Sequence, residues 1–195
     1  MSKRIILLCC SCILCAFALS APLSAQEERR SLLFEIGAGL GFPGYPVEAE
    51  AVLSGLDDRP GVERFRVAVD VSVGFALSQN TFLMAGMDGT GDRLMDDSDY
   101  MQVNLYLYSL GLRYYPRTTG FYFEGNLGTT ACLIQLSDLE SRVSDFGFGY
   151  GAALGYDFND SPRGFGLSLE ARFNGLEIEG DAASALMLTL NCCWK

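Results

Sequence analysis

The densest group of candidate metal ligands in the sequence is the acidic segment DGTGDRLMDDSD, residues 88–99. It contains five aspartates, Asp88, Asp92, Asp96, Asp97 and Asp99. Carboxylate oxygens are the ligands that calcium and magnesium prefer. The spacing departs from an EF-hand loop, because Arg93 occupies the position of the invariant glycine and Asp99 replaces the bidentate glutamate. We therefore favour a solvated acidic loop, which still allows diffuse bridging of divalent cations to anionic molecules.

Catalytic chemistry is restricted by the absence of histidine from the sequence. Without histidine there is no Ser-His-Asp or Cys-His pair, and the usual zinc sites lose a ligand. The glycines of GAGLG (37–41) and FGFGYG (146–151) could suggest a phosphate loop. Their spacing of two places them on one face of a strand, with no following helix to hold an anion. We expect no enzymatic activity, no cofactor and no nucleic-acid partner.

The N-terminal segment has the three-part pattern of a secretory signal peptide. Lys3 and Arg4 precede an apolar run at residues 5–19, and small residues follow. The run is shorter than the roughly 20 residues of a membrane-spanning helix. Removal of residues 1–25 takes away two positive charges and no acids, so the net charge changes from −10 to −12. We expect an exported domain at residues 26–195, delivered by the general secretory route.

The elements that would position these side chains are β-strands. Apolar residues alternate with small or polar ones through most of the mature chain, which is the period of a strand. The pattern predicts eight strands, at residues 31–42, 65–77, 81–87, 100–115, 121–134, 146–158, 165–173 and 185–194. Near Tyr108 the apolar residues change phase, which indicates a β-bulge. No segment has the pattern of an amphipathic helix.

The segments between these strands alternate in length. Short turns are predicted at 78–80, 116–120 and 159–164, and long loops at 43–64, 88–99, 135–145 and 174–184. The long loops together carry a net charge of −12, which is the whole charge of the mature chain. Antiparallel strands in even number, with turns at one end and loops at the other, are typical of bacterial outer-membrane barrels. We therefore predict an all-β fold, an eight-stranded antiparallel up-and-down transmembrane β-barrel with its short turns toward the periplasm.

The composition of the two strand faces indicates which one contacts lipid. One face carries Val, Leu and Phe, whereas the other carries mainly Gly, Ala, Ser, Thr and Asn. A soluble barrel, which is the alternative, would present many charged side chains on its outer face. The mature chain has only one lysine, Lys195. We therefore assign the apolar face to lipid and the face of small residues to a narrow lumen.

Six charged residues fall on the predicted lumen face, namely Arg66, Asp70, Arg113, Glu124, Glu170 and Arg172. A charge removed from water without a partner is strongly destabilising. Arg113 and Glu124 can face each other across a hairpin, and Arg172 is two residues from Glu170 on the same face. We predict an ion-pair network that fills the lumen and leaves no continuous ion path. The alternative places these residues near the rims, solvated and energetically minor.

Sequence features at three strands resemble the small outer-membrane barrels of the OmpA-barrel, OmpX and OmpW type. The fourth strand ends in GLRYYP, the fifth starts with FYFEGNLG, and the last has an apolar face that includes Cys192. The resemblance implies that this face, with Leu188, Leu190 and Trp194, forms the C-terminal signal read by the barrel-assembly machinery. Lys195 follows the aromatic residue.

The resemblance implies an integral protein in outer-membrane lipid, and it does not by itself give the function. Our leading hypothesis is a structural or surface-interaction role, with acidic loops offered to host surface molecules or divalent cations. The alternative is passive transport of small, hydrophobic molecules, as OmpW-like proteins are thought to perform. A polar, filled lumen favours the first function, and an apolar lumen wall with a lateral gap favours the second.

Overall fold

The computed structural model describes residues 32–96, 99–116, 120–137, 139–158 and 164–194. The predicted signal peptide, Asp97 and Lys195 lie outside these ranges. Among the described residues, no helix has both the length and the apolar character needed to span a membrane.

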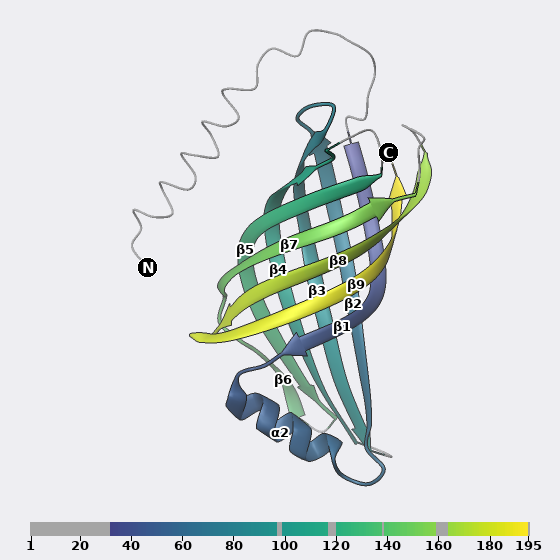
Figure 1. Ribbon diagram of the computed structural model, residues 1–195. Helices are drawn as coiled ribbons and strands as arrows, with labels where there is room; N and C mark the ends of the chain where they lie inside the picture. Colours follow the sequence, from purple (N-terminus) through teal and green to yellow (C-terminus); the bar gives the residue numbers. More distant parts are fainter. Residues whose placement is uncertain (1–31, 97–98, 117–119, 138, 159–163, 195) are drawn as a thin grey trace.

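The described part of the chain forms nine strands and one helix. They are β1 (Leu32–Gly44), α2 (Val47–Asp57), β2 (Glu63–Ala76), β3 (Thr81–Asp96), β4 (Asp99–Tyr114), β5 (Phe121–Leu136), β6 (Leu139–Val143), β7 (Gly147–Asp157), β8 (Phe165–Ile178) and β9 (Asp181–Trp194). Eight of the strands close into a barrel in which β9 pairs with β1, and the short β6 pairs only with β5 (Figure 1). All pairs are antiparallel, so the predicted all-β eight-stranded barrel is confirmed.

The barrel strands are long enough to cross a bilayer. They contain 11 to 16 residues, whereas an ordinary strand has about five or six and a tilted transmembrane strand needs roughly nine to eleven. Closure pairs every barrel strand with a neighbour on both sides, as a lipid environment requires. In Figure 1, α2 lies at one end of the barrel, and the start of β1 and the end of β9 lie at the other. We call these the α2 end and the turn end.

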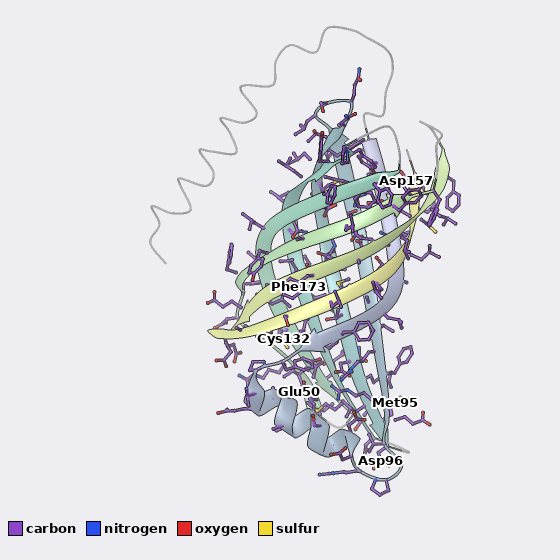
Figure 2. All side chains as sticks on the ribbon, in the orientation of Figure 1. Glu50, Met95, Asp96, Cys132, Asp157 and Phe173 are labelled. Carbon is purple, nitrogen blue, oxygen red and sulfur yellow. The ribbon has the colours of Figure 1, made fainter. Side chains whose placement is uncertain are left out.

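Side chains alternate between the lumen and the outer surface along each strand. In β1, Leu33 and Glu35 are buried, whereas Phe34 and Ile36 are exposed on the outside. Large apolar side chains such as Phe173 surround the barrel (Figure 2). The assignment of the apolar face to lipid is therefore confirmed, because such a surface is stable only in a membrane.

Aromatic side chains gather outside the barrel at the turn end. The ring of Trp194 lies 5.7 Å from that of Phe34 and 5.4 Å from that of Phe165, between centroids. Phe121 packs edge-on against Tyr156 at 4.8 Å. Aromatic girdles of this kind mark the membrane–water boundary of transmembrane barrels.

Residues 88–96 of the acidic segment form a strand and not a loop, in contrast to both sequence interpretations. β3 continues to Asp96 and pairs with β4 as far as Asp99. The strand pattern was hidden because two of the outward positions, 89 and 91, are glycines, and at Gly89 the side chain of Tyr106 covers the vacant position. The predicted loop 174–184 likewise shrinks to a turn at Glu179 and Gly180, which both have positive φ.

The β-bulge predicted near Tyr108 is wrong. Pairing of β4 with both neighbours continues through Tyr108 without a shift in register. The apolar residues change phase because their surroundings change. Leu110 and Leu112 face outward, whereas Leu105 and Leu107 point inward into an apolar cluster.

Helix α2 was also missed by the sequence analysis. It begins after Pro46, and Glu48 and Glu50 in its first turn interact favourably with the helix dipole. Within the helix only Leu53 is buried, so no apolar stripe marks it in the sequence. The helix lies across the barrel mouth (Figure 1), because Leu53 and Leu56 pack on the apolar cluster.

Candidate functional site: a filled lumen and an acidic rim

The lumen contains three layers of side chains. At the turn end, an apolar layer consists of Leu33, Phe82, Met84, Tyr115, Tyr122 and Cys193. At the α2 end, a second apolar layer consists of Leu53, Leu94, Val103, Leu105, Leu107, Cys132, Leu176 and Ala183. A band of charged residues lies between them. The three cysteines of the described chain, Cys132, Cys192 and Cys193, are free.

Arg113 organises one half of the charged band. Its guanidinium has no solvent exposure and lies 2.5 Å from the Glu35 carboxylate and 2.8 Å from that of Glu124. It also stacks over the Tyr122 ring, 4.2 Å from the centroid, and the Tyr122 hydroxyl donates a hydrogen bond to Glu170. A buried cation is stable only with such compensation.

Arg172 organises the other half of the band. Its Nε donates to Glu170 at 2.8 Å, and its two terminal nitrogens lie 2.8 Å from Glu124 and 3.3 Å from Asp88. Glu124 therefore bridges both arginines, which joins β4, β5 and β8 through one carboxylate.

Asp70 is the least compensated member of the band. It is directly across the β2–β3 pair from Asp88, so two carboxylates occupy paired positions on the lumen face. The closest approach of Arg172 to Asp70 is 4.0 Å, and no hydrogen bond to the Asp70 carboxylate occurs among the described residues. Five buried acids, Glu35, Asp70, Asp88, Glu124 and Glu170, share two arginines. The band thus has more carboxylates than cations.

The structure brings five of the six predicted lumen residues together and separates the sixth. Arg66 is partly exposed and lies at the α2 end, 3.4 Å from Asp92. The sequence analysis did not place Asp88 on the lumen face, because its segment was interpreted as a loop. Alternation of Asp88, Thr90 and Asp92 with glycine was the available signal.

A second polar cluster fastens α2 to the barrel. Arg64 lies 2.6 Å from Asp92 and 3.1 Å from Asp57 at the end of the helix. The Tyr45 hydroxyl donates to Asp92 at 3.4 Å. Burial, followed by the nearby Asp92 carboxylate, raises the pKa of Tyr45 well above its ordinary value. Tyr45 therefore stays a neutral donor, and the cluster links both ends of α2 to β3.

The predicted metal ligands are spread over the height of the barrel. Asp88 and Asp92 are buried at different levels of the lumen, whereas Asp96 and Asp99 are exposed at the β3–β4 turn. In the part of the chain that the structure describes, no group of three or more Cys, Asp or Glu residues is arranged to hold a metal ion. Asp96 and Asp99 belong instead to a group of exposed acidic side chains at the α2 end.

The closed barrel, its apolar exterior and its aromatic girdle define an integral protein of the bacterial outer membrane. Residues 11–192 match the outer membrane protein beta-barrel domain family, and the chain belongs to this family. A comparison with curated protein sequences gives no match.

Solved structures with a similar fold include two surface proteins. Ail, the attachment invasion locus protein of Yersinia pestis, crystallised with the heparin analogue sucrose octasulfate, has a TM-score of 0.56 at 12% identity, with 85% of this chain and 100% of that chain covered. Neisserial surface protein A has a TM-score of 0.57 at 12% identity, with 87% and 99% covered. At such identity the likeness shows the fold alone.

Proposed function

We propose that the protein is a surface-interaction protein of the outer membrane, whose acidic α2 end binds cationic host molecules. The observation that carries the proposal is the acidic rim. Exposed acids at this end include Glu48, Asp57, Asp58, Glu63, Asp96, Asp99, Glu177, Glu179 and Asp181. Charge of one sign at a surface steers oppositely charged partners and rejects like-charged ones. The long-connection end of such barrels faces outward.

The filled lumen supports an interaction role over a transport role. Two apolar layers and a charged band occupy the barrel from end to end, and eight strands enclose only enough space for side chains. The ligand class differs from that of Ail, which has been crystallised with an anionic heparin analogue. An acidic rim repels polyanions, so the partner proposed here carries basic residues.

Binding of charged polymers to the folded protein in vesicles tests the proposal. Polylysine should bind and heparin should not, with affinity that falls as salt rises. A variant with Glu48→Gln, Asp58→Asn and Glu63→Gln removes three exposed charges that form no ion pair with another described residue, and should weaken polylysine binding several-fold. Arg59→Gln, at an exposed position in the same connection, should strengthen it. Equal binding by all variants would contradict the proposal.

A second candidate function is passage of small apolar molecules. The observation in its favour is the apolar character of the lumen wall at the α2 end, where Val103, Leu105 and Leu107 point inward. Uptake of an apolar dye into vesicles that contain the folded barrel would support it. The charged band opposes this route, since an apolar solute would have to displace buried ion pairs.

We also propose that residues 1–25 are removed during export and that the last strand is the assembly signal. Leu188, Leu190 and Trp194 are exposed on the outer face of β9, where an assembly factor could reach them. N-terminal sequencing of the protein from membranes tests the first point. Loss of membrane insertion in Trp194→Ala, with Leu40→Ala as the control at another exposed apolar position, tests the second.

A further inference from the structure

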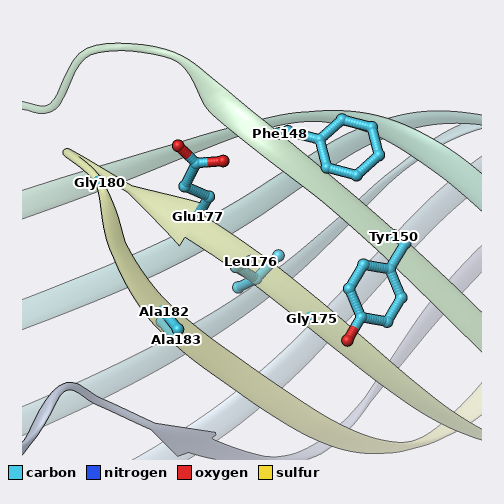
Figure 3. A pocket seen from close by; sticks show the side chains of 8 residues that line it. All are labelled: Phe148, Tyr150, Gly175, Leu176, Glu177, Gly180, Ala182 and Ala183. Atoms are coloured by element: carbon cyan, nitrogen blue, oxygen red, sulfur yellow. The ribbon is translucent and has the colours of Figure 1, made fainter. Parts of the chain in front are cut away.

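A groove of about 290 Å³ lies on the outer wall of the barrel near the α2 end, over strands β7, β8 and β9 (Figure 3). Phe148 and Tyr150 form one side, and Ala182 lies on the other. At Gly175 the strand has no side chain, and the Tyr150 ring lies against that position. The floor is therefore formed by backbone and small residues beside one aromatic wall.

The groove belongs to the lipid-facing surface. Phe148 and Tyr150 are exposed, and they lie on the same outward face of β7 as Leu154. Leu176 and Ala183 also line the groove, although both belong to the apolar layer inside the barrel. Because Phe148 and Tyr150 belong both to the outward face of β7 and to the groove, the apolar surface continues from the lipid belt into the groove.

The strand pairing of the barrel wall is interrupted beside this groove. β7 pairs with β8 only as far as Gly149 opposite Leu176, and beyond that point β8 pairs with β9 alone. On the other side of β7, β5 pairs with β7 only as far as Thr130, and from Leu133 onward it pairs with β6. The Thr130 hydroxyl donates a hydrogen bond to the Glu177 carbonyl oxygen across this gap. The groove therefore lies at a break in the strand ladder, where the smooth wall is interrupted.

The negative charge beside the groove indicates which lipid headgroup it can accept. Glu177 is the one charged side chain among the described residues that line it. Glu179 and Asp181 follow in the turn, and the exposed Arg142 is paired with Glu179 at 3.5 Å. An anionic headgroup or a free fatty acid would be repelled here, whereas an ammonium group would be attracted.

We propose that this groove binds one acyl chain of a membrane phospholipid whose headgroup carries an ammonium group, which contacts Glu177. The apolar walls hold the chain, and the Glu177 carboxylate sits at the level of the polar headgroup. The site shares Glu177 with the acidic rim, but its apolar lining belongs to the lipid-facing surface. The rim variant with Glu48→Gln, Asp58→Asn and Glu63→Gln leaves Glu177 unchanged, so each proposal can fail without the other.

Fluorescence quenching by brominated lipids tests the site. Trp194 is the only tryptophan, so Trp194→Phe with Phe148→Trp gives a reporter in the groove. The folded protein is placed in phosphatidylglycerol vesicles that contain a small fraction of brominated phosphatidylethanolamine or brominated phosphatidylglycerol. The ethanolamine lipid should quench about threefold more effectively, the scale of one partly exposed ion pair. A Phe65→Trp reporter on the distant wall of β2 should show no preference.

Two further substitutions separate the chain site from the headgroup site. Ala182→Leu fills the groove and should abolish the preference, whereas Ala152→Leu, exposed on β7 outside the groove, should leave it unchanged. Glu177→Gln should equalise the two lipids while the reporter remains quenched. Equal quenching in the parent protein, stronger quenching by brominated fatty acid, or a preference that survives Ala182→Leu would overturn the proposal. Heat-modifiable migration in detergent gels verifies that each variant is folded.

Discussion

Single residues of the charged band differ in how well their charge is compensated. Glu124 accepts charge-assisted hydrogen bonds from Arg113 and Arg172, whereas Asp70 accepts none among the described residues and faces Asp88. Glu124→Gln should therefore lower the free energy of unfolding by about 2–3 kcal/mol. Asp70→Asn should change it by less than about 1 kcal/mol, or raise it, because a repelled carboxylate is removed. Urea unfolding of the folded protein in vesicles measures both values.

The comparison is matched, because each substitution replaces a buried carboxylate by an amide of the same shape. Equal destabilisation by the two variants would contradict the view that Asp70 is uncompensated.

The pairing of Arg113 with Glu124 followed from hairpin geometry in the sequence, since inward positions face each other across adjacent strands. The contacts of Arg172 with Asp88 on β3 could not be predicted, because they cross the lumen between strands that are not neighbours.

Among the elements, we expect α2 to unfold independently of the barrel. Leu53 is its only buried side chain, and Arg64 fastens its end to Asp92. Leu53→Ala removes that anchor, which destabilises a packed site by about 2 kcal/mol or more. Amide hydrogen exchange in α2 should then be roughly 30-fold faster, while the barrel amides remain unchanged. The exposed Val52→Ala is the control and should not alter exchange. Slower migration or loss of folded barrel in Leu53→Ala would contradict a separate α2 unit.

The elements also show where sequence patterns succeed. Alternation predicted the strands in the lipid belt, because one face meets lipid and the other a polar lumen. It failed at the α2 end, where the interior is apolar and the two faces of β4 no longer contrast. It failed for β3, where outward glycines are covered by Tyr106, and for α2, where one buried leucine is too weak a signal. These failures all lie at the end where lumen and exterior cease to differ in polarity.

For the whole molecule, closure of the lumen rests on three successive layers. Phe82 and Tyr122 fill the turn end, the arginine–carboxylate band fills the centre, and Leu53 with its cluster fills the α2 end. Each apolar layer excludes hydrated ions, and in the band the carboxylates other than Asp70 are held by close contacts with Arg113 or Arg172. The unmodified protein should therefore give no steady conductance in single-channel recordings across a planar bilayer.

The layered arrangement also predicts what removal of one layer does. The double change Arg113→Ala with Glu124→Ala removes two members of the central band but leaves both apolar layers intact, so it should produce at most brief, small openings. Leu53→Ser, which wets only the α2 end, should remain silent, because the band and the turn-end layer persist. A wide-lumen barrel reconstituted in the same way provides the positive control. Steady, large conductance from the unmodified protein would contradict a filled lumen. Full opening by Leu53→Ser alone would show instead that α2 is the sole barrier, and that the inner layers admit water and ions.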